Sequence, residues 1–93
     1  MNYHSIEVQP SPYSARFLIN EKLRLARKHI NKMSLDWSEK NAAVARYCID
    51  EVLTTTRAYV FAGLISEVEA LYVEFEISAL TTRSYQRVVE AMQ

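Results

Sequence analysis

The chain has 93 residues, 11 basic and 11 acidic side chains, and a formal net charge of zero at pH 7. This size fits one domain, and a hydrophobic content of 49% argues against a disordered or fibrous chain. One glycine and two prolines are too few for the many tight turns of a β-sandwich, so the composition favours long helices.

The N-terminal residues 1–12 show no helical periodicity. They contain both prolines of the chain and a short alternation through Ile6 and Val8, which is typical of extended structure. We expect an extended arm that is either frayed or adds to the edge of a partner. The single helical domain is expected over residues 13–93.

The first helix is predicted over residues 13–33. Either Ser11 or Ser14 can cap its start, and Pro12 suits an opening position. Apolar residues then recur at spacings of four, three, four and three, which places them on one side of a helix. This packing stripe consists of Ile19, Leu23, Ala26, Ile30 and Met33.

A second helix is predicted over residues 37–62. The segment that begins at Asp36 and ends at Glu39 resembles a capping box with Asp36 at the N-cap, and Gly63 suits the end of the helix. Apolar residues occupy two faces of this helix, which is typical of a central helix. A run of threonines at residues 54–56 lowers helix propensity and could allow a kink.

A third helix is predicted over residues 67–80, where Ser66 and Glu69 form a second capping box. Residues 71–78 also alternate between apolar and polar side chains, as a strand would. The helix is favoured, because the capping box and the helix-forming Glu and Ala residues agree with it and no partner strand is apparent.

A short fourth helix is predicted over residues 83–92, because Thr81 and Thr82 are expected to interrupt the third one. The predicted fold is therefore all-α, a compact bundle of three to four helices with the second helix at its centre.

The third helix is apolar on two sides. Its expected packing face consists of Leu64, Val68, Leu71, Phe75 and Ala79, and its back carries Val73, Ile77 and Leu80. A domain of this size cannot easily cover both sides of this helix as well as both faces of the second one. The excess of apolar surface predicts a homodimer or an obligate protein partner.

Charge is placed unevenly along the chain. Residues 1–33 hold six basic and two acidic side chains, a net +4, whereas residues 34–93 hold five basic and nine acidic ones, a net −4. The two parts should attract each other, within one chain or between chains. The acidic side chains of the third helix are expected to form a solvated acidic surface, namely Glu67, Glu69, Glu74 and Glu76.

The first helix carries a basic face opposite its packing stripe, made of Arg24, Arg27, Lys28 and Lys32. Such a face could contact nucleic-acid phosphate, an acidic protein or the acidic part of this chain. The neutral total charge argues against nucleic acid, which stays the alternative. Phe17 also lies opposite the packing stripe, so it is the best single candidate for an exposed anchor in a partner interface.

Catalytic chemistry has little support in these residues. Cys48 falls on an apolar helix face, where a small buried hydrophobe is the usual role. Neither His4 nor His29 has ligand spacing to another metal-binding residue, and no Glu-x-x-His pattern accompanies the glutamates. A single glycine excludes a phosphate-cradling loop. We expect no catalytic residue, cofactor or metal.

The chain is expected to be cytoplasmic, because its lone cysteine cannot form an internal disulfide and no apolar signal segment opens it. The longest apolar run is far shorter than the roughly 20 residues of a membrane span, so no membrane contact is expected. The resulting hypothesis is a small non-catalytic interaction protein, such as an adaptor, inhibitor or regulatory subunit, that acts through helical surfaces on a protein partner. The alternative is a nucleic-acid-associated regulator that uses the basic face of the first helix.

Overall fold

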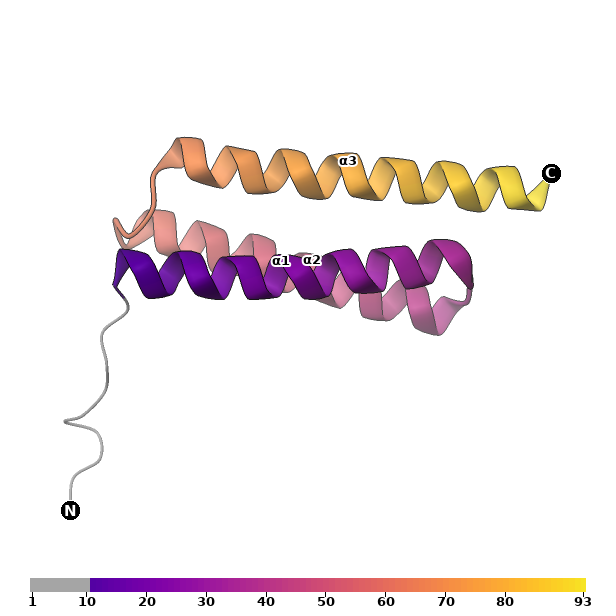
Figure 1. The fold of residues 1–93 in the computed structure, drawn as a ribbon, viewed down its shortest axis with the longest axis horizontal. Coiled ribbons are helices and arrows are strands. Elements are labelled where there is room, and N and C mark those ends of the chain that lie inside the picture. Colours follow the sequence, from indigo (N-terminus) through magenta and orange to yellow (C-terminus); the bar gives the residue numbers. More distant parts are fainter. Residues whose placement is uncertain (1–10) are drawn as a thin grey trace, which may run out of the picture.

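Three α-helices make up the part of the chain that the computed structural model describes, residues 11–93. They are α1 (Pro12–Leu35), α2 (Glu39–Phe61) and α3 (Glu67–Met92). In Figure 1, α1 and α3 lie side by side and run in the same direction, while α2 returns antiparallel to both. Residues 11–93 contain no strand, so the all-α fold and the helix over residues 71–78 are confirmed. Most of the predicted arm, residues 1–10, lies outside the described residues.

Two of the predicted serine caps are confirmed. At the start of α1, the Ser11 hydroxyl accepts a hydrogen bond from the Ser14 N–H at 3.1 Å, and Pro12 occupies the first helical position. At the start of α3, the Ser66 hydroxyl accepts from the Glu69 N–H at 3.1 Å while the Glu69 carboxylate accepts from the Ser66 N–H at 2.7 Å. These bonds satisfy backbone donors that a helix start leaves without partners.

The corner between α1 and α2 differs from the prediction. Ser38 is the N-cap of α2, because its hydroxyl accepts a hydrogen bond from the Asn41 N–H at 3.0 Å. Asp36 instead ends α1, where its N–H donates to the Lys32 carbonyl at 2.9 Å. The predicted capping box between Asp36 and Glu39 is therefore wrong. Serine caps a helix as well as aspartate does, so the nearer Ser38 can take this role while Asp36 closes α1.

The end of α2 follows the prediction. Gly63 adopts a left-handed backbone conformation with φ of 74° directly after the C-cap residue Ala62. Its N–H donates to the Val60 carbonyl at 3.0 Å, and the Leu64 N–H donates to the Tyr59 carbonyl at 2.9 Å. This pair of bonds is a Schellman motif, which satisfies the last carbonyls of α2 and turns the chain toward α3.

Threonines interrupt neither of the two later helices. The Thr81 hydroxyl donates to the Ile77 carbonyl at 2.8 Å, and the Thr56 hydroxyl donates to the Val52 carbonyl at 2.6 Å. Each hydroxyl thus finds an acceptor one turn back, so threonine does not need to leave the helix. The predicted fourth helix over residues 83–92 is wrong, because α3 is one continuous helix to Met92.

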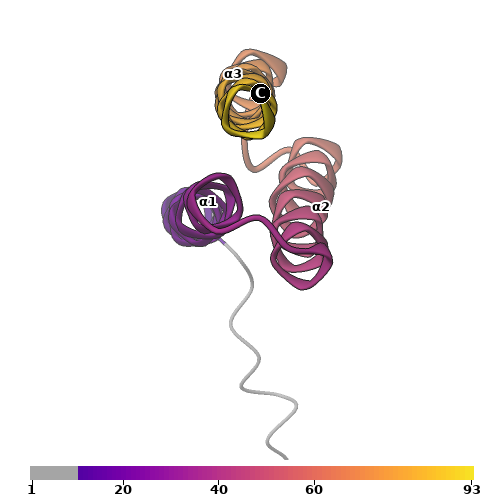
Figure 2. The same cartoon turned by 90° about the vertical axis from the view of Figure 1, so that its right-hand side faces the viewer.

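The core is built on α1. All five residues of the predicted packing stripe are buried, at 5% exposure or less. Helix α1 contacts α2 and α3 each more extensively than those two helices contact each other, and Figure 2 shows the three helices at the corners of a triangle. The central helix is therefore α1, and the prediction that α2 is central is wrong. The second apolar face of α2 stays only partly buried at residues such as Ile49 and Leu53.

The two sides of α3 are exchanged relative to the prediction. Ile77 is only 4% exposed, and Val73 and Leu80 pack against the core. The expected packing residues Val68 and Phe75 are instead 60% and 69% exposed. The chain itself therefore covers Ile77 fully and Val73 and Leu80 in part, so the prediction that these three residues form a partner interface is wrong. Small residues on the same side allow α3 to approach the other helices closely, since Ala70 and Ser84 are almost completely buried.

Candidate protein interaction surface

Helix α3 presents a long apolar surface to solvent. Its large apolar side chains on this side are between 40% exposed at Leu71 and 71% exposed at Tyr72. We call this set the α3 outer face: Val68, Leu71, Tyr72, Phe75, Tyr85, Val89 and Met92. The first four members surround a shallow depression. Exposed apolar side chains that cluster in this way mark an interaction site more often than scattered ones do.

The position of the α3 outer face follows from helical spacing. Val68, Phe75 and Val89 are separated by multiples of seven residues, so they lie along one line of the helix. Ala70, Ile77 and Ser84 also recur every seven residues, on the side that is buried. Helical spacing in the sequence places Val68, Leu71 and Phe75 on one apolar face, but as the packing face of the helix, whereas the structure exposes them.

Ion pairs hold α3 against both other helices. Arg16 on α1 donates from Nε to Glu69 Oε1 at 2.7 Å, and Arg27 on α1 pairs with Glu76. From α2, Arg57 donates to Glu67 Oε1 at 2.7 Å, and its Nε lies 2.8 Å from Glu74 Oε1. The attraction between the basic and acidic parts of the sequence therefore occurs within one chain. The four glutamates of the predicted acidic surface are all paired with arginines, with side chains that stay 33% to 57% exposed.

The predicted basic face of α1 is divided. Arg27 points to α3 through its pair with Glu76, while Arg24 pairs with Glu21 on its own helix at 3.1 Å. Lys28 and Lys32 are exposed on α1. Two of the four predicted cations thus already contact carboxylates, which reduces the positive charge available to a phosphate backbone.

Phe17 lies on the outside of α1 and is 55% exposed. The placement expected from helical spacing is therefore correct, and its role as an anchor stays a prediction. It belongs to a different helix from the α3 outer face, so residues 11–93 expose large apolar side chains on more than one helix.

The ion pair at Glu69 leads to a pH-dependence prediction. The pKa of Glu69 lies below its usual range, first because Arg16 donates to its carboxylate and second because the Ser66 N–H does. The charged carboxylate is thus favoured by folding, so its contribution is present above the unfolded pKa of about 4.3 and is lost as the pH falls through the lower folded value. We expect the urea midpoint of the natural protein to fall more between pH 7 and pH 3 than that of Glu69→Gln.

Glutamine at position 69 can keep the capping hydrogen bond with Ser66, so this substitution removes the charge of the side chain without removing the helix cap. Glu90→Gln is the matched control, since Glu90 is exposed in the last turns of the same helix and makes no ion pair within residues 11–93. Equal acid sensitivity of Glu69→Gln and the natural protein would show that the pair with Arg16 does not hold the charge in solution.

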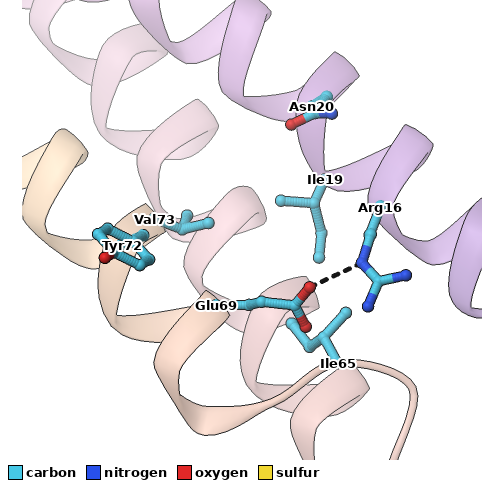
Figure 3. Close-up of a pocket in the computed structure, with 7 residues that line it drawn as sticks. All are labelled: Arg16, Ile19, Asn20, Ile65, Glu69, Tyr72 and Val73. Carbon is cyan, nitrogen blue, oxygen red and sulfur yellow. Dashed lines mark hydrogen bonds and ion pairs between the residues drawn. The ribbon is translucent and has the colours of Figure 1, made fainter.

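A groove of about 220 Å³ lies between the first turns of α1 and α3. Figure 3 shows Arg16 reaching across from α1 to Glu69, with Ile19 and Ile65 beside the ion pair and Tyr72 on the far side from Arg16. The two charged groups neutralise each other, so what the groove offers a partner is an apolar floor. Tyr72 also belongs to the α3 outer face, which makes the groove continuous with that surface.

A second polar cluster joins α1 to α2 beside Cys48. Glu51 accepts hydrogen bonds from Lys22 Nζ and from the Tyr47 hydroxyl, both at 3.1 Å, and these contacts lower its pKa, with Lys22 contributing most. Burial raises the pKa of the Cys48 thiol, and the charge of Glu51 adds to this shift. A thiol that stays protonated is a poor nucleophile, and a carboxylate of low pKa is a poor general base to activate it. Through the contact of Lys22 with Glu51, the cluster links α1 to α2.

Residues 11–93 contain no group of three or more His, Cys, Asp or Glu side chains that could hold a metal ion. Within the same residues, no helix is both long enough and apolar enough to cross a membrane. Comparison of the chain with protein-family models, curated proteins and solved structures finds no match. Among residues 11–93, α3 carries more exposed large apolar side chains than either of the other two helices.

Proposed function

We propose that this chain is a small, non-catalytic interaction protein, an adaptor, inhibitor or regulatory subunit, that binds a protein partner through the α3 outer face. The observation that carries this proposal is the row of exposed apolar side chains from Val68 to Phe75. Their exposure costs stability in water, and covering them with another apolar surface recovers that free energy at roughly 25 cal/mol per Å².

The chemistry of the remaining surface supports a binding role. The charged clusters between helices pair acidic with basic side chains, and burial raises the pKa of the Cys48 thiol. An intracellular location agrees with this free, half-buried cysteine, since reducing compartments preserve thiols. Aromatic residues are enriched where interfaces derive most of their affinity, and Tyr72 and Phe75 lie side by side in helical spacing on the exposed side.

The test is a capture experiment with matched variants. Tagged natural protein, Phe75→Glu and Phe61→Glu are incubated with native lysate, with and without nuclease treatment, and bound proteins are identified by mass spectrometry. Phe61 is the control because it is 96% exposed and ends α2, so it is not a member of the α3 outer face. We expect one protein in near-stoichiometric yield with the natural chain and with Phe61→Glu, and its loss with Phe75→Glu, because a carboxylate cannot be buried in an apolar interface without a large desolvation cost.

Retention of the same partner by Phe75→Glu would contradict the assignment of this face. Loss of bound proteins on nuclease treatment alone would instead favour the nucleic-acid alternative. Circular dichroism of the three proteins should be equal, since both phenylalanines lie outside the core.

A further inference from the structure

We propose that the α3 outer face pairs with the same face of a second copy of this chain, with the two α3 helices antiparallel about a two-fold axis near residue 80. This inference depends on the proposed function, since it requires the face to be an interaction surface, and it names the occupant. The order of side-chain sizes along α3, the charges beside the face and its area all favour this pairing.

Side-chain size along α3 is arranged symmetrically. Bulky apolar residues occupy both ends of the exposed side, and the middle holds small residues, Ser78, Ala79 and Thr82, all exposed. In an antiparallel pair, a residue of one copy that lies a given number of positions before the axis faces the residue of the other copy that lies the same number of positions after it. The facing pairs are Val68 with Met92, Leu71 with Val89, Phe75 with Tyr85, and Ser78 with Thr82. Large apolar residues of one copy thus meet large apolar residues of the other. The small residues lie near the two-fold axis, where the two α3 helices come closest together.

The charges beside the α3 outer face also favour the antiparallel arrangement. Glu69, Glu76 and Arg83 recur every seven residues on one flank of this face, and Arg87 follows one turn later. About a perpendicular two-fold axis, the same flanks of the two helices lie next to each other. Arg83 of one copy then lies level with Glu76 of the other, and Arg87 lies between Glu69 and Glu76, while Glu90 lies near Glu69. A parallel pair would instead place this flank beside the opposite flank of the second copy, where Glu67 and Glu74 lie level with Glu69 and Glu76.

Arg83 and Arg87 make no ion pair with any residue of the described part of the chain, so both are available for such contacts. The two glutamates already contact Arg16 and Arg27, and a carboxylate has lone pairs left to accept further hydrogen bonds. The second copy would therefore extend the ion pairs of α3 into a network that crosses the interface.

The area of the face is sufficient for a stable dimer. The seven members of the α3 outer face are 40% to 71% exposed, and at roughly 150 to 200 Å² for a full side chain of this size they expose about 700 Å². The small residues between them add to this area. A standard stable interface buries about 800 Å² per partner, so pairing along the whole of α3 reaches the required size.

The first test is the mass of the full chain in solution. Sedimentation equilibrium over a wide concentration range should give twice the 10.8 kDa of one chain for the natural protein and for Phe61→Glu. Phe75→Glu should sediment as a monomer, because each dimer would bury its two carboxylates. A natural protein that stays monomeric at all concentrations, or a Phe75→Glu variant that still dimerises, would overturn the inference.

The second test determines the direction of pairing. In a Cys48→Ala background, Leu71→Cys and Val89→Cys chains are oxidised alone and as an equal mixture, and the products are identified by mass. Antiparallel pairing predicts the mixed disulfide, because the two positions face each other. Each variant alone should resist cross-linking, because its two thiols lie about 27 Å apart along the helices. Disulfides within each single variant would show parallel pairing and reject the proposed axis.

These outcomes separate the inference from the function on which it depends. If the natural protein is a monomer but Phe75→Glu abolishes capture of a different protein, the proposed function holds and the second copy is excluded as the occupant. If the natural protein dimerises as described and the captured partner is retained by Phe75→Glu, the α3 outer face serves self-association and the partner binds elsewhere.

Discussion

Replacing Ile30 with alanine is expected to lower the free energy of unfolding by about 3 kcal/mol, within the range of roughly 2 to 5 kcal/mol for such truncations. Ile30 is 0% exposed and is one of the largest fully buried side chains. It lies on α1, the helix that contacts both others, so the cavity left by alanine cannot be closed by moving one helix alone. Small domains have a total stability of about 5 to 10 kcal/mol, so this loss should be visible as a large shift in the urea midpoint.

Leu35→Ala is the matched control, because Leu35 ends the same helix and is 82% exposed. It should change the free energy of unfolding by less than about 0.5 kcal/mol, as is usual for surface substitutions. A loss below about 1 kcal/mol for Ile30→Ala would mean that the three helices do not pack around α1 in solution.

Replacing Ala45 with leucine is expected to destabilise the fold by about 1 to 3 kcal/mol through overpacking. Ala45 is 1% exposed on the inner side of α2, and Ala15, Ala26 and Ala70 are 0% exposed on the other two helices. These small residues let the helix axes approach closely, so three additional carbons at this position have no space. Thermal and urea unfolding should both report the loss.

Ala43→Leu separates packing from helix propensity. Ala43 is exposed two residues before Ala45 on the same helix, and leucine is almost as good a helix former as alanine. This control should leave the unfolding midpoint nearly unchanged. An equally small effect at Ala45 would show that α2 stands farther from its neighbours than the structure indicates.

Local signals in the sequence predicted the helices well. The two serine caps at Ser11 and Ser66 and the left-handed Gly63 depend on residues close in sequence, and each was confirmed. The packing stripe of α1 was also predictable, because its outer side is too polar to compete with it for the core. The threonine runs misled, because a hydroxyl that bonds the carbonyl one turn back keeps threonine within the helix.

The orientation of α3 could not be predicted from periodicity. Both of its sides are apolar at helical spacing, and the side with Phe75 has the greater bulk. The structure buries the side with Ala70 and Ile77, where small residues permit close contact and the flanking glutamates reach arginines on both neighbours. Those contacts join residues far apart in the chain, such as Arg16 and Glu69. A single sequence does not reveal such pairs, so the exposed side of α3 was predicted to be its packing face.

The order in which the helices assemble follows from the short corner between α1 and α2. Residues 36–38 are the only connection there, so contacts between these two helices close small loops. The ion pair of Arg16 with Glu69 instead joins residues 53 positions apart, which costs more chain entropy to form. We therefore expect the α1 and α2 hairpin to nucleate folding and α3 to dock last. During synthesis on the ribosome, the apolar groove of that hairpin would stay open until the C-terminal helix emerges.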